Sequence, residues 1–406
     1  MKKYDITIIG GGMVGLSLAA LLSQNHFSVA VVESSEFSYP ENQLTARVSA
    51  IHLTSQKLFQ YLRIWNDLEK NAAPLQEMKI WDHTQNAHLH FDSREINETE
   101  LGWIVANHDI VNTLHQKLIR DNKVDFFCPT TPTDFVIEND QVILTLNNSE
   151  KICTNLIVGA DGAHSWVRKQ MPIHTPSRSY YQKAIIAVIE TSLPHDSCAI
   201  QKFLKTGPVA LLPLKNSHHT ALVWSADDAI SDALMQKSPN EFDAALTDAL
   251  DFKLGKLTSI SDRKQFPLTM RHADEYSANH FALVGDAAHT IHPLAGLGVN
   301  LGLMDAACLT QVLIDARLTK NTFYSFYTLR RYTRWRKSEN TVTISGMRFL
   351  KEIFAIDAPW FNIARSTGVN LIDQSDWMKN WLMHIVTGEH DDQPKFLSNE
   401  MRLDHA

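Results

Sequence analysis

The 406-residue sequence has few cysteines and no long apolar run. Its four cysteines, Cys128, Cys153, Cys198 and Cys308, are far apart and form no CxxC pair. This spacing argues against a disulfide scaffold and a structural zinc site, and it fits a reducing compartment. No uninterrupted apolar stretch reaches the roughly 18 residues that a membrane-spanning helix needs.

A strong charge of either sign is also missing. The net charge is −7, so no whole-chain attraction to nucleic acid is expected. The amino-terminal MKKYDITIIGGG has two lysines before apolar residues, but Asp5 interrupts the run and no cleavage site follows. We therefore expect a cytoplasmic protein, either soluble or peripheral to the inner membrane. With 44% hydrophobic residues, the chain can form one large or two ordinary domains.

The first glycine-rich segment lies between two apolar, strand-like runs within residues 5–33. Its G-x-G-x-x-G spacing permits a tight turn, close approach of the backbone to a pyrophosphate, and packing of a helix on a strand. The free N–H groups at the helix start bind phosphate, and an acid after the second strand can accept from ribose hydroxyls. This pattern predicts a dinucleotide site, for FAD or NAD, made by Gly10, Gly12, Met13, Val14, Gly15 and Glu33.

Two further apolar runs end in glycine and aspartate. NLIVGADGAHSWVRKQ (155–170) carries one such pair, and FALVGDA (281–287) carries the other, followed by a glycine-rich loop and an apolar helix. Three units of this kind predict one extended ligand that is contacted from three sides, as FAD would be. The residues concerned are Asp161, Gly162, Gly285, Asp286, Gly296, Gly298, Val299 and Asn300.

Together the three motifs resemble the single-component FAD-dependent aromatic hydroxylases that share the p-hydroxybenzoate hydroxylase fold. The segments TARVSAIHLTS (45–55), LGWIVANHDIVNTL (101–114) and HPLAGLGVNLGLMDA (292–306) resemble the ubiquinone-biosynthesis hydroxylase family. The resemblance implies noncovalent FAD, with NAD(P)H as a transient co-substrate and O2. It also implies hydroxylation of an aromatic ring of a polyprenylated phenol through a flavin C4a-hydroperoxide.

The resemblance also implies roles for individual residues. Asp286 would hydrogen-bond the ribityl chain, and the backbone amides from Gly298 to Asn300 would face the pyrimidine edge of the flavin. Arg47 would contact the cofactor, and Asp161 and Gly162 would lie near the pyrophosphate and the NAD(P)H path. The substrate pocket would be mostly apolar, without an arginine for a carboxylate. No catalytic acid–base pair and no set of metal ligands stands out.

These patterns predict an α/β fold with a second, antiparallel sheet. We expect a discontinuous Rossmann-type FAD-binding domain with a parallel sheet from 1–75, 101–180 and 271–345. A substrate domain from 76–100 and 181–270 would roof the flavin, and 346–406 would form a helical region that includes Trp360, Trp377 and Trp381. The basic stretch 329–337 is interpreted as a solvated helix face, with a membrane contact as the alternative.

Other functions remain open at this point. A halogenase, epoxidase or prenyl reductase could use the same fold, although the WxWxIP motif of flavin halogenases is absent. A non-catalytic FAD-binding subunit of a biosynthetic complex is a further alternative. It is suggested by Leu297, which stands where the resembled family usually has glutamine.

Overall fold

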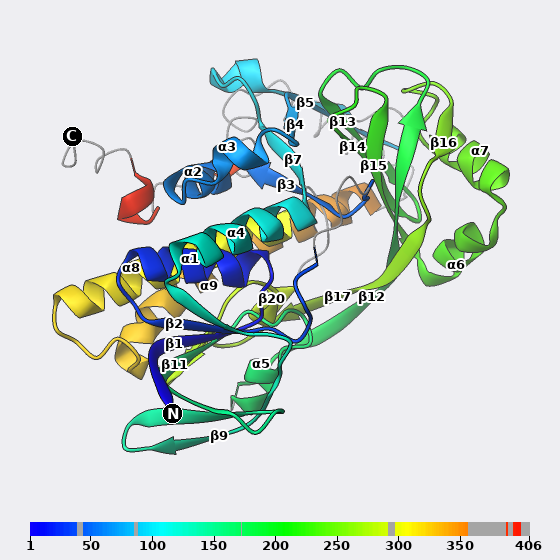
Figure 1. The fold of residues 1–406 in the computed structure, drawn as a ribbon. Helices are drawn as coiled ribbons and strands as arrows, with labels where there is room; N and C mark the ends of the chain where they lie inside the picture. Colours follow the sequence, from blue (N-terminus) through cyan, green and yellow to red (C-terminus); the bar gives the residue numbers. More distant parts are fainter. Residues whose placement is uncertain are drawn as a thin grey trace.

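A computed structural model describes residues 1–38, 44–84, 88–171, 173–290, 297–355, 387–388 and 393–398 of the chain. Helices surround one sheet, and a second sheet extends away from it with two helices of its own (Figure 1). This arrangement confirms the α/β class predicted from the sequence, with a parallel sheet and an antiparallel sheet.

The first sheet has a parallel centre in the order β19-β11-β1-β2-β8. Its central strands are apolar and β-branched because both faces are covered, and Ile6 and Ile8 are fully buried. Antiparallel strands β18, β9 and β10 complete it. The bounds are β1 Lys2–Ile9, β2 Val29–Val32, β8 Val124–Phe127, β9 Pro132–Glu138, β10 Gln141–Leu146, β11 Lys151–Gly159, β18 Ser277–Ala278 and β19 Phe281–Leu283.

The helices of this part include one that is mostly apolar. Residues Gly298–Leu318 of α8 are long and apolar enough to cross a membrane by composition, but 78% of the 18-residue window tested is buried inside the protein. The helix packs against α1 and α9. The bounds are α1 Met13–Gln24, α2 Leu53–Tyr61, α3 Trp65–Leu68, α4 Asn107–Asp121, α5 Trp166–Gln170, α8 Leu297–Leu318 and α9 Phe326–Ala355, with short 3-10 turns at Ser93–Ile96, Gly285–Ala287 and Lys395–Leu397.

The second sheet has nine strands in the order β20-β17-β12-β15-β14-β13-β5-β6, with β16 beside β12. All pairs are antiparallel except β13 with β5. The segment around 77–92 therefore joins the same sheet as the later strands, as the sequence analysis expected. The bounds are β5 Glu77–Asp82, β6 His88–Asp92, β12 Ser177–Thr191, β13 Cys198–Leu204, β14 Gly207–Pro213, β15 His219–Asp227, β16 Leu257–Ser259, β17 Lys264–His272 and β20 His289–Thr290.

One face of this sheet packs on α6 (Asp228–Gln236) and α7 (Pro239–Ala249). Alternate strand residues such as Leu222 and Trp224 form that core with Phe242. The intervening residues point to the opposite face, because side chains alternate along a strand. A substrate cavity can therefore form on that opposite face.

A small third sheet was not anticipated. It contains β3 (Val48–His52), β7 (Gly102–Ala106) and β4 (Ala73–Leu75), and its residues share an apolar cluster with the second sheet. Two features differ from the expected segment limits. Strand β20 extends the second sheet beyond residue 270, and α9 runs through residue 345 without a break. The tryptophans at 360, 377 and 381 lie outside the described residues.

Candidate cofactor and substrate site

The three glycine motifs meet at one edge of the parallel sheet. Ile9 at the end of β1 pairs with Gly159 at the end of β11, which pairs with Leu283 at the end of β19. The three strands are parallel, so the loops that follow them emerge side by side. Ligands of parallel α/β sheets bind at this carboxyl edge. The loops after these three strands are therefore close enough together to contact one ligand, as the sequence analysis predicted.

The glycines of the first turn have different tasks. A Cβ on Gly10 (φ +108°) would lie 2.4 Å from the carbonyl oxygen of Ala160, and a Cβ on Gly15 would lie 2.0 Å from that of Gly10. These two glycines are required by packing within the protein. A Cβ on Gly12 would meet nothing within 4 Å. Gly12 therefore faces open space, as a residue that approaches a phosphate must.

The start of α1 is open to a ligand. Gly12 is its N-cap and provides no side-chain cap, so the first N–H groups of the helix are available to an anion. Gly12 and Met13 line a cleft with Arg47, Asn107 and Lys264 that encloses about 1630 Å³ of empty space including its mouth. The structure thus brings Arg47 to the same cleft as the glycine turn.

Glu33 follows β2, where the sequence analysis placed it. Its Oε2 accepts a hydrogen bond from the Gly11 amide at 2.6 Å, and its Oε1 accepts from the Ser35 amide at 2.9 Å. The carboxylate therefore holds the glycine turn in place. A role toward ribose stays a prediction.

Asp161 has a split environment. Its Oδ2 accepts from the amides of Trp166 (2.6 Å) and Val167 (3.2 Å) at the start of α5. Its Oδ1 is buried and has no hydrogen-bond partner among the described residues, and burial raises the pKa of the carboxyl. An unpaired buried oxygen is costly, and this one has too little accessible surface to face a ligand in the cleft. The next residue, Gly162, has φ +74° and open space at its Cβ position.

The first and third motifs touch directly. Val14 on α1 packs against Gly285 (φ +59°) and Gly302, where added Cβ atoms would approach its side chain to 3.3 and 2.7 Å. Asp286 lies next to this contact, and its side chain is accessible to solvent. The protein around it still removes part of the water from the carboxyl, and this desolvation raises its pKa. The Asp286 side chain is therefore available to a ligand in a sheltered place.

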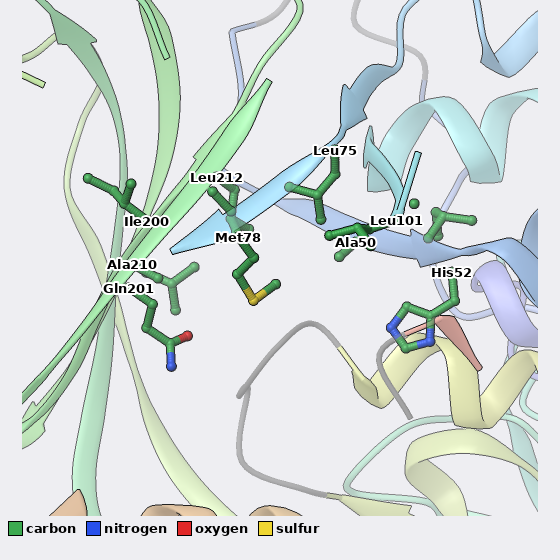
Figure 2. Close-up of a pocket in the computed structure, with 13 residues that line it drawn as sticks. Ala50, His52, Leu75, Met78, Leu101, Ile200, Gln201, Ala210 and Leu212 are labelled. Carbon is green, nitrogen blue, oxygen red and sulfur yellow. The ribbon is translucent and has the colours of Figure 1, made fainter. Parts of the chain in front are cut away.

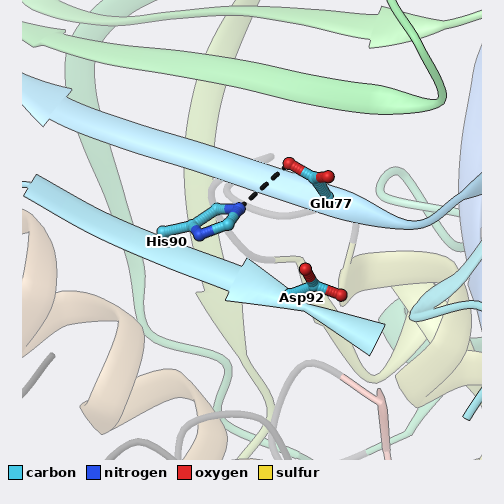
Figure 3. A group of neighbouring side chains, drawn as sticks. All are labelled: Glu77, His90 and Asp92. Atoms are coloured by element: carbon cyan, nitrogen blue, oxygen red, sulfur yellow. Dashed lines mark hydrogen bonds and ion pairs between the residues drawn. The ribbon is translucent and has the colours of Figure 1, made fainter. Parts of the chain in front are cut away.

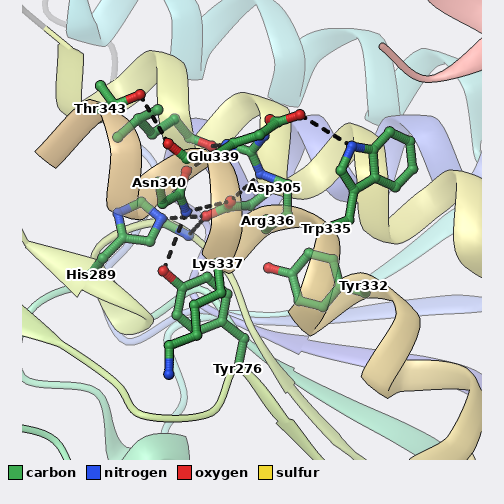
Figure 4. A network of polar contacts seen from close by, with 12 residues as sticks. Tyr276, His289, Asp305, Tyr332, Trp335, Arg336, Lys337, Glu339, Asn340 and Thr343 are labelled. Carbon is green, nitrogen blue, oxygen red and sulfur yellow. Dashed lines mark hydrogen bonds and ion pairs between the residues drawn. The ribbon is translucent and has the colours of Figure 1, made fainter. Parts of the chain in front are cut away.

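A buried polar network holds the Gly285 loop (Figure 4). Asp305 on α8 accepts at Oδ2 from the Gly285 amide (3.0 Å) and from His289 Nε2 (2.6 Å). At Oδ1 it accepts from Arg336 Nε (2.8 Å) and Asn340 Nδ2 (3.2 Å) on α9. Burial disfavours the Asp305 carboxylate, but attraction to His289 and Arg336 outweighs this and lowers its pKa to about 2. An ionised carboxylate therefore ties the loop to both helices.

The interpretation of 329–337 as a solvated face was wrong for half of that helix. The side chain of Arg336 is 2% exposed and Tyr332 is buried, whereas Arg330, Arg331 and Arg334 face solvent. Residues four apart share one helix face, so the spacing of Tyr332 and Arg336 could have indicated a buried face of this helix. The number of basic residues in the stretch drew attention to the solvent-exposed face instead. The sequence analysis also gave no role to Asp305.

Helix α8 begins at Leu297, so Gly298, Val299 and Asn300 occupy its first turn, and Gly296 lies outside the described residues. The Asn300 side chain has a task that was not predicted. Its oxygen accepts from the His52 amide at 3.0 Å, and its Nδ2 donates to the Ala50 carbonyl at 2.7 Å. Asn300 therefore fastens strand β3 to the start of α8.

An apolar cavity lies between the second sheet and β3, with about 580 Å³ of empty space when its open mouth is included (Figure 2). Its walls include Leu75, Met78 and Leu212, and among the described lining residues only His52 and Gln201 have polar side chains. No arginine or lysine lines the described part of the cavity, which matches the expected pocket for an uncharged aromatic compound. Polar groups that are few and well placed are typical of small-molecule sites.

One group in the described part of the chain has ligand atoms close enough for a metal: Glu77, His90 and Asp92 (Figure 3). The carboxylates are already paired. Lys79 lies 3.0 Å from Glu77, and Arg94 Nε donates to Asp92 at 2.9 Å. These ion pairs account for both acids, and the group lies on β5 and β6, away from the glycine motifs.

Comparison with known proteins decides the family. The family described as FAD binding domain matches residues 3–327 of the chain. The chain belongs to the FAD-binding monooxygenase family. It is 33% identical over 390 residues to the 3-demethoxyubiquinol 3-hydroxylase of Escherichia coli K12, covering 95% of this chain and 99% of the relative. Ubiquinone hydroxylase UbiL of Rhodospirillum rubrum is 30% identical, with 95% and 90% covered.

The fold of this chain is also found in a solved structure. The p-nitrophenol 4-monooxygenase PnpA of Pseudomonas putida DLL-E4 superimposes with a TM-score of 0.77 at 16% identity, covering 96% of this chain and all of the other. Membership in the family confirms the predictions of FAD as cofactor and of a monooxygenase as the class of enzyme. The open space at Gly12 and the uncapped start of α1 fit a bound FAD on structural grounds alone.

Proposed function

We propose that this monooxygenase hydroxylates an aromatic ring of a polyprenylated phenol in ubiquinone biosynthesis, with NAD(P)H and O2 as co-substrates. In the overall reaction one oxygen atom of O2 enters a ring C–H bond as hydroxyl, the other leaves as water, and NAD(P)H is oxidised. The observation that carries the proposal is the cavity beside α8, which is apolar and has no cationic lining residue among those described. The names of the relatives agree with it.

The residues of the chain have separable tasks in this reaction. Gly12 and Met13 at the start of α1 bind the pyrophosphate of FAD, and Asp286 accepts from its ribityl hydroxyls. When bound, FAD supplies the redox chemistry that links NAD(P)H to O2. The first turn of α8, which contains Gly298 and Val299, would hold the flavin ring at its N-terminal end, where a helix start stabilises negative charge by about 1 kcal/mol.

The cavity orients the ring and excludes water. Its apolar wall favours a long hydrocarbon tail, because each buried methylene contributes about 0.8 kcal/mol. A small charged benzoate would lose that contribution and would find no basic side chain among the described lining residues. Turnover should therefore be higher with prenylated phenols than with p-hydroxybenzoate.

We also propose that the protein is cytoplasmic and contacts the inner membrane peripherally, within or beside a ubiquinone-biosynthesis complex. A substrate with a polyprenyl tail is concentrated in the membrane, and exposed Arg330, Arg331 and Arg334 on α9 suit an anionic surface.

Deletion of the gene tests the proposed function. Cells without the protein should accumulate a prenylated phenol that lacks one ring hydroxyl, and the wild-type gene should restore the missing product. A variant with Gly12→Val, which places a branched side chain where the phosphate approaches, should not restore it. Accumulation of no such precursor would refute the proposal.

A further inference from the structure

Among the described residues that line the cavity, one polar side chain has no hydrogen-bond partner in the described part of the chain. Gln201 lies on β13 and is half-buried, and its side chain forms no hydrogen bond with any residue in the described part of the chain. Figure 2 shows its amide and the His52 ring entering the cavity from opposite walls, with Met78 between them. His52 differs from Gln201 because it has a partner within the protein.

The sheet places Gln201 among small apolar neighbours. It is paired with Ala210 on β14 and with Ile80 on β5, and Ala199 precedes it on the same face of β13. The alanines at 199 and 210 are small, so they leave space beside the amide on two sides. A polar group in an apolar cavity loses hydrogen bonds to water when a ligand enters, unless the ligand replaces them.

The chemistry of the amide selects the kind of ligand group. Its Oε1 accepts a hydrogen bond and its Nε2 donates one, whereas a guanidinium would select a carboxylate. A neutral ring hydroxyl can donate and accept in the same way. We infer that Gln201 hydrogen-bonds the ring oxygen of the phenol and so fixes the orientation of the ring in the cavity. This inference rests on the proposed function for the class of substrate.

The test measures binding rather than turnover. Wild-type protein loaded with FAD is titrated in a calorimeter with a prenylated phenol and with the same compound lacking the ring hydroxyl. The wild type should prefer the phenol by about tenfold, the effect of one neutral hydrogen bond. In Gln201→Leu, which has similar size and no amide, the preference should fall to about twofold or less, mainly through weaker binding of the phenol. Leu212→Met, on the same wall, should keep the wild-type preference.

The outcomes separate this inference from the proposed function. An unchanged preference in Gln201→Leu, or no preference in the wild type, would overturn the role of Gln201 even if the phenol is hydroxylated. Loss of the preference in Gln201→Leu supports the role, even if the deletion experiment excludes ubiquinone biosynthesis. Coupling provides a second readout, because a misoriented ring should yield less hydroxylated product per NAD(P)H consumed.

Discussion

The side chain of Asn300 accepts a hydrogen bond from the backbone amide of His52 at 3.0 Å, across 248 positions of sequence. The same side chain donates to the carbonyl oxygen of Ala50 at 2.7 Å. It joins the helix start expected at the flavin to the strand that lines the substrate cavity. In the proposed reaction, the distance between cofactor and substrate would therefore depend on this buried amide.

Replacing Asn300 with alanine should weaken the fold and loosen this distance. Two buried backbone groups would lose their partners, which should lower the free energy of unfolding by about 2–4 kcal/mol. Denaturant titration of the FAD-loaded protein measures the loss, and peroxide release per NAD(P)H should rise. Asn321→Ala, at an exposed position, is the matched control and should change the free energy by less than about 0.5 kcal/mol. Equal stability of the two variants would show that the Asn300 bonds are unimportant.

Substitutions at two glycines of the first turn should have different effects, one on folding and the other on cofactor binding. Gly15→Ala places a Cβ 2.0 Å from a backbone oxygen and should destabilise the protein with or without FAD. Gly12→Ala has free space in the protein itself, so the apoprotein should melt like the wild type while its affinity for FAD falls. Thermal denaturation and flavin fluorescence measure the two effects. A Gly12→Ala protein that binds FAD normally would refute the proposed phosphate contact.

Much of the fold and half of the site could be predicted from the sequence because the signals are local. Gly10, Gly12 and Gly15 stand between a β-branched run and an apolar helix, and local sterics fix what such a turn does. Asp305 and Arg336 were missed because each is significant only through a partner on another helix. No spacing in the sequence reports that contact.

The third sheet was missed for a similar reason. Its strands β3, β4 and β7 are short, and their pairing depends on contacts between distant segments. Gln201 was not distinguished from other strand residues because only the cavity reveals which face it occupies. The position of Leu297 at the first turn of α8 is described, and its proposed effect on the flavin stays a prediction.

Breaking the Asp305–Arg336 pair should be costly. Asp305→Asn removes one of the two carboxylates that pair with the buried Arg336 guanidinium, Glu339 being the other, and should lower the free energy of unfolding by about 1–3 kcal/mol. The Gly285 loop should loosen as well, so that FAD dissociates faster. Arg334→Ala, on the solvent side of the same helix, should leave both properties near the wild type. FAD retained by Asp305→Asn at wild-type affinity would refute the role of the network at the loop.

Stability should fall in mild acid because of His272. Burial, with repulsion from His289, lowers the pKa of His272 from 6.5 to about 4. Between these values the unfolded chain binds a proton that the folded protein does not, so stability decreases as the pH drops through that window. The contribution is about 2 kcal/mol after allowance for partial exposure.

The measurement compares free energies of unfolding at pH 7 and pH 4.5. The decrease should be smaller in His272→Gln, which can still hydrogen-bond the Tyr276 hydroxyl that lies 2.7 Å from the imidazole. His164→Gln is the control, because His164 is an exposed residue and its replacement should leave the decrease unchanged. The same pH dependence in wild type and His272→Gln would assign the effect to other groups.

The most direct test of the account is hydroxylation under ¹⁸O2 by the purified protein with FAD bound. The account predicts that a prenylated phenol stimulates NAD(P)H oxidation and that its product carries one labelled ring hydroxyl. A small charged benzoate should do so more weakly or not at all. Full FAD occupancy with no labelled product across a panel of prenylated phenols would contradict the account and would indicate a non-catalytic FAD-binding subunit.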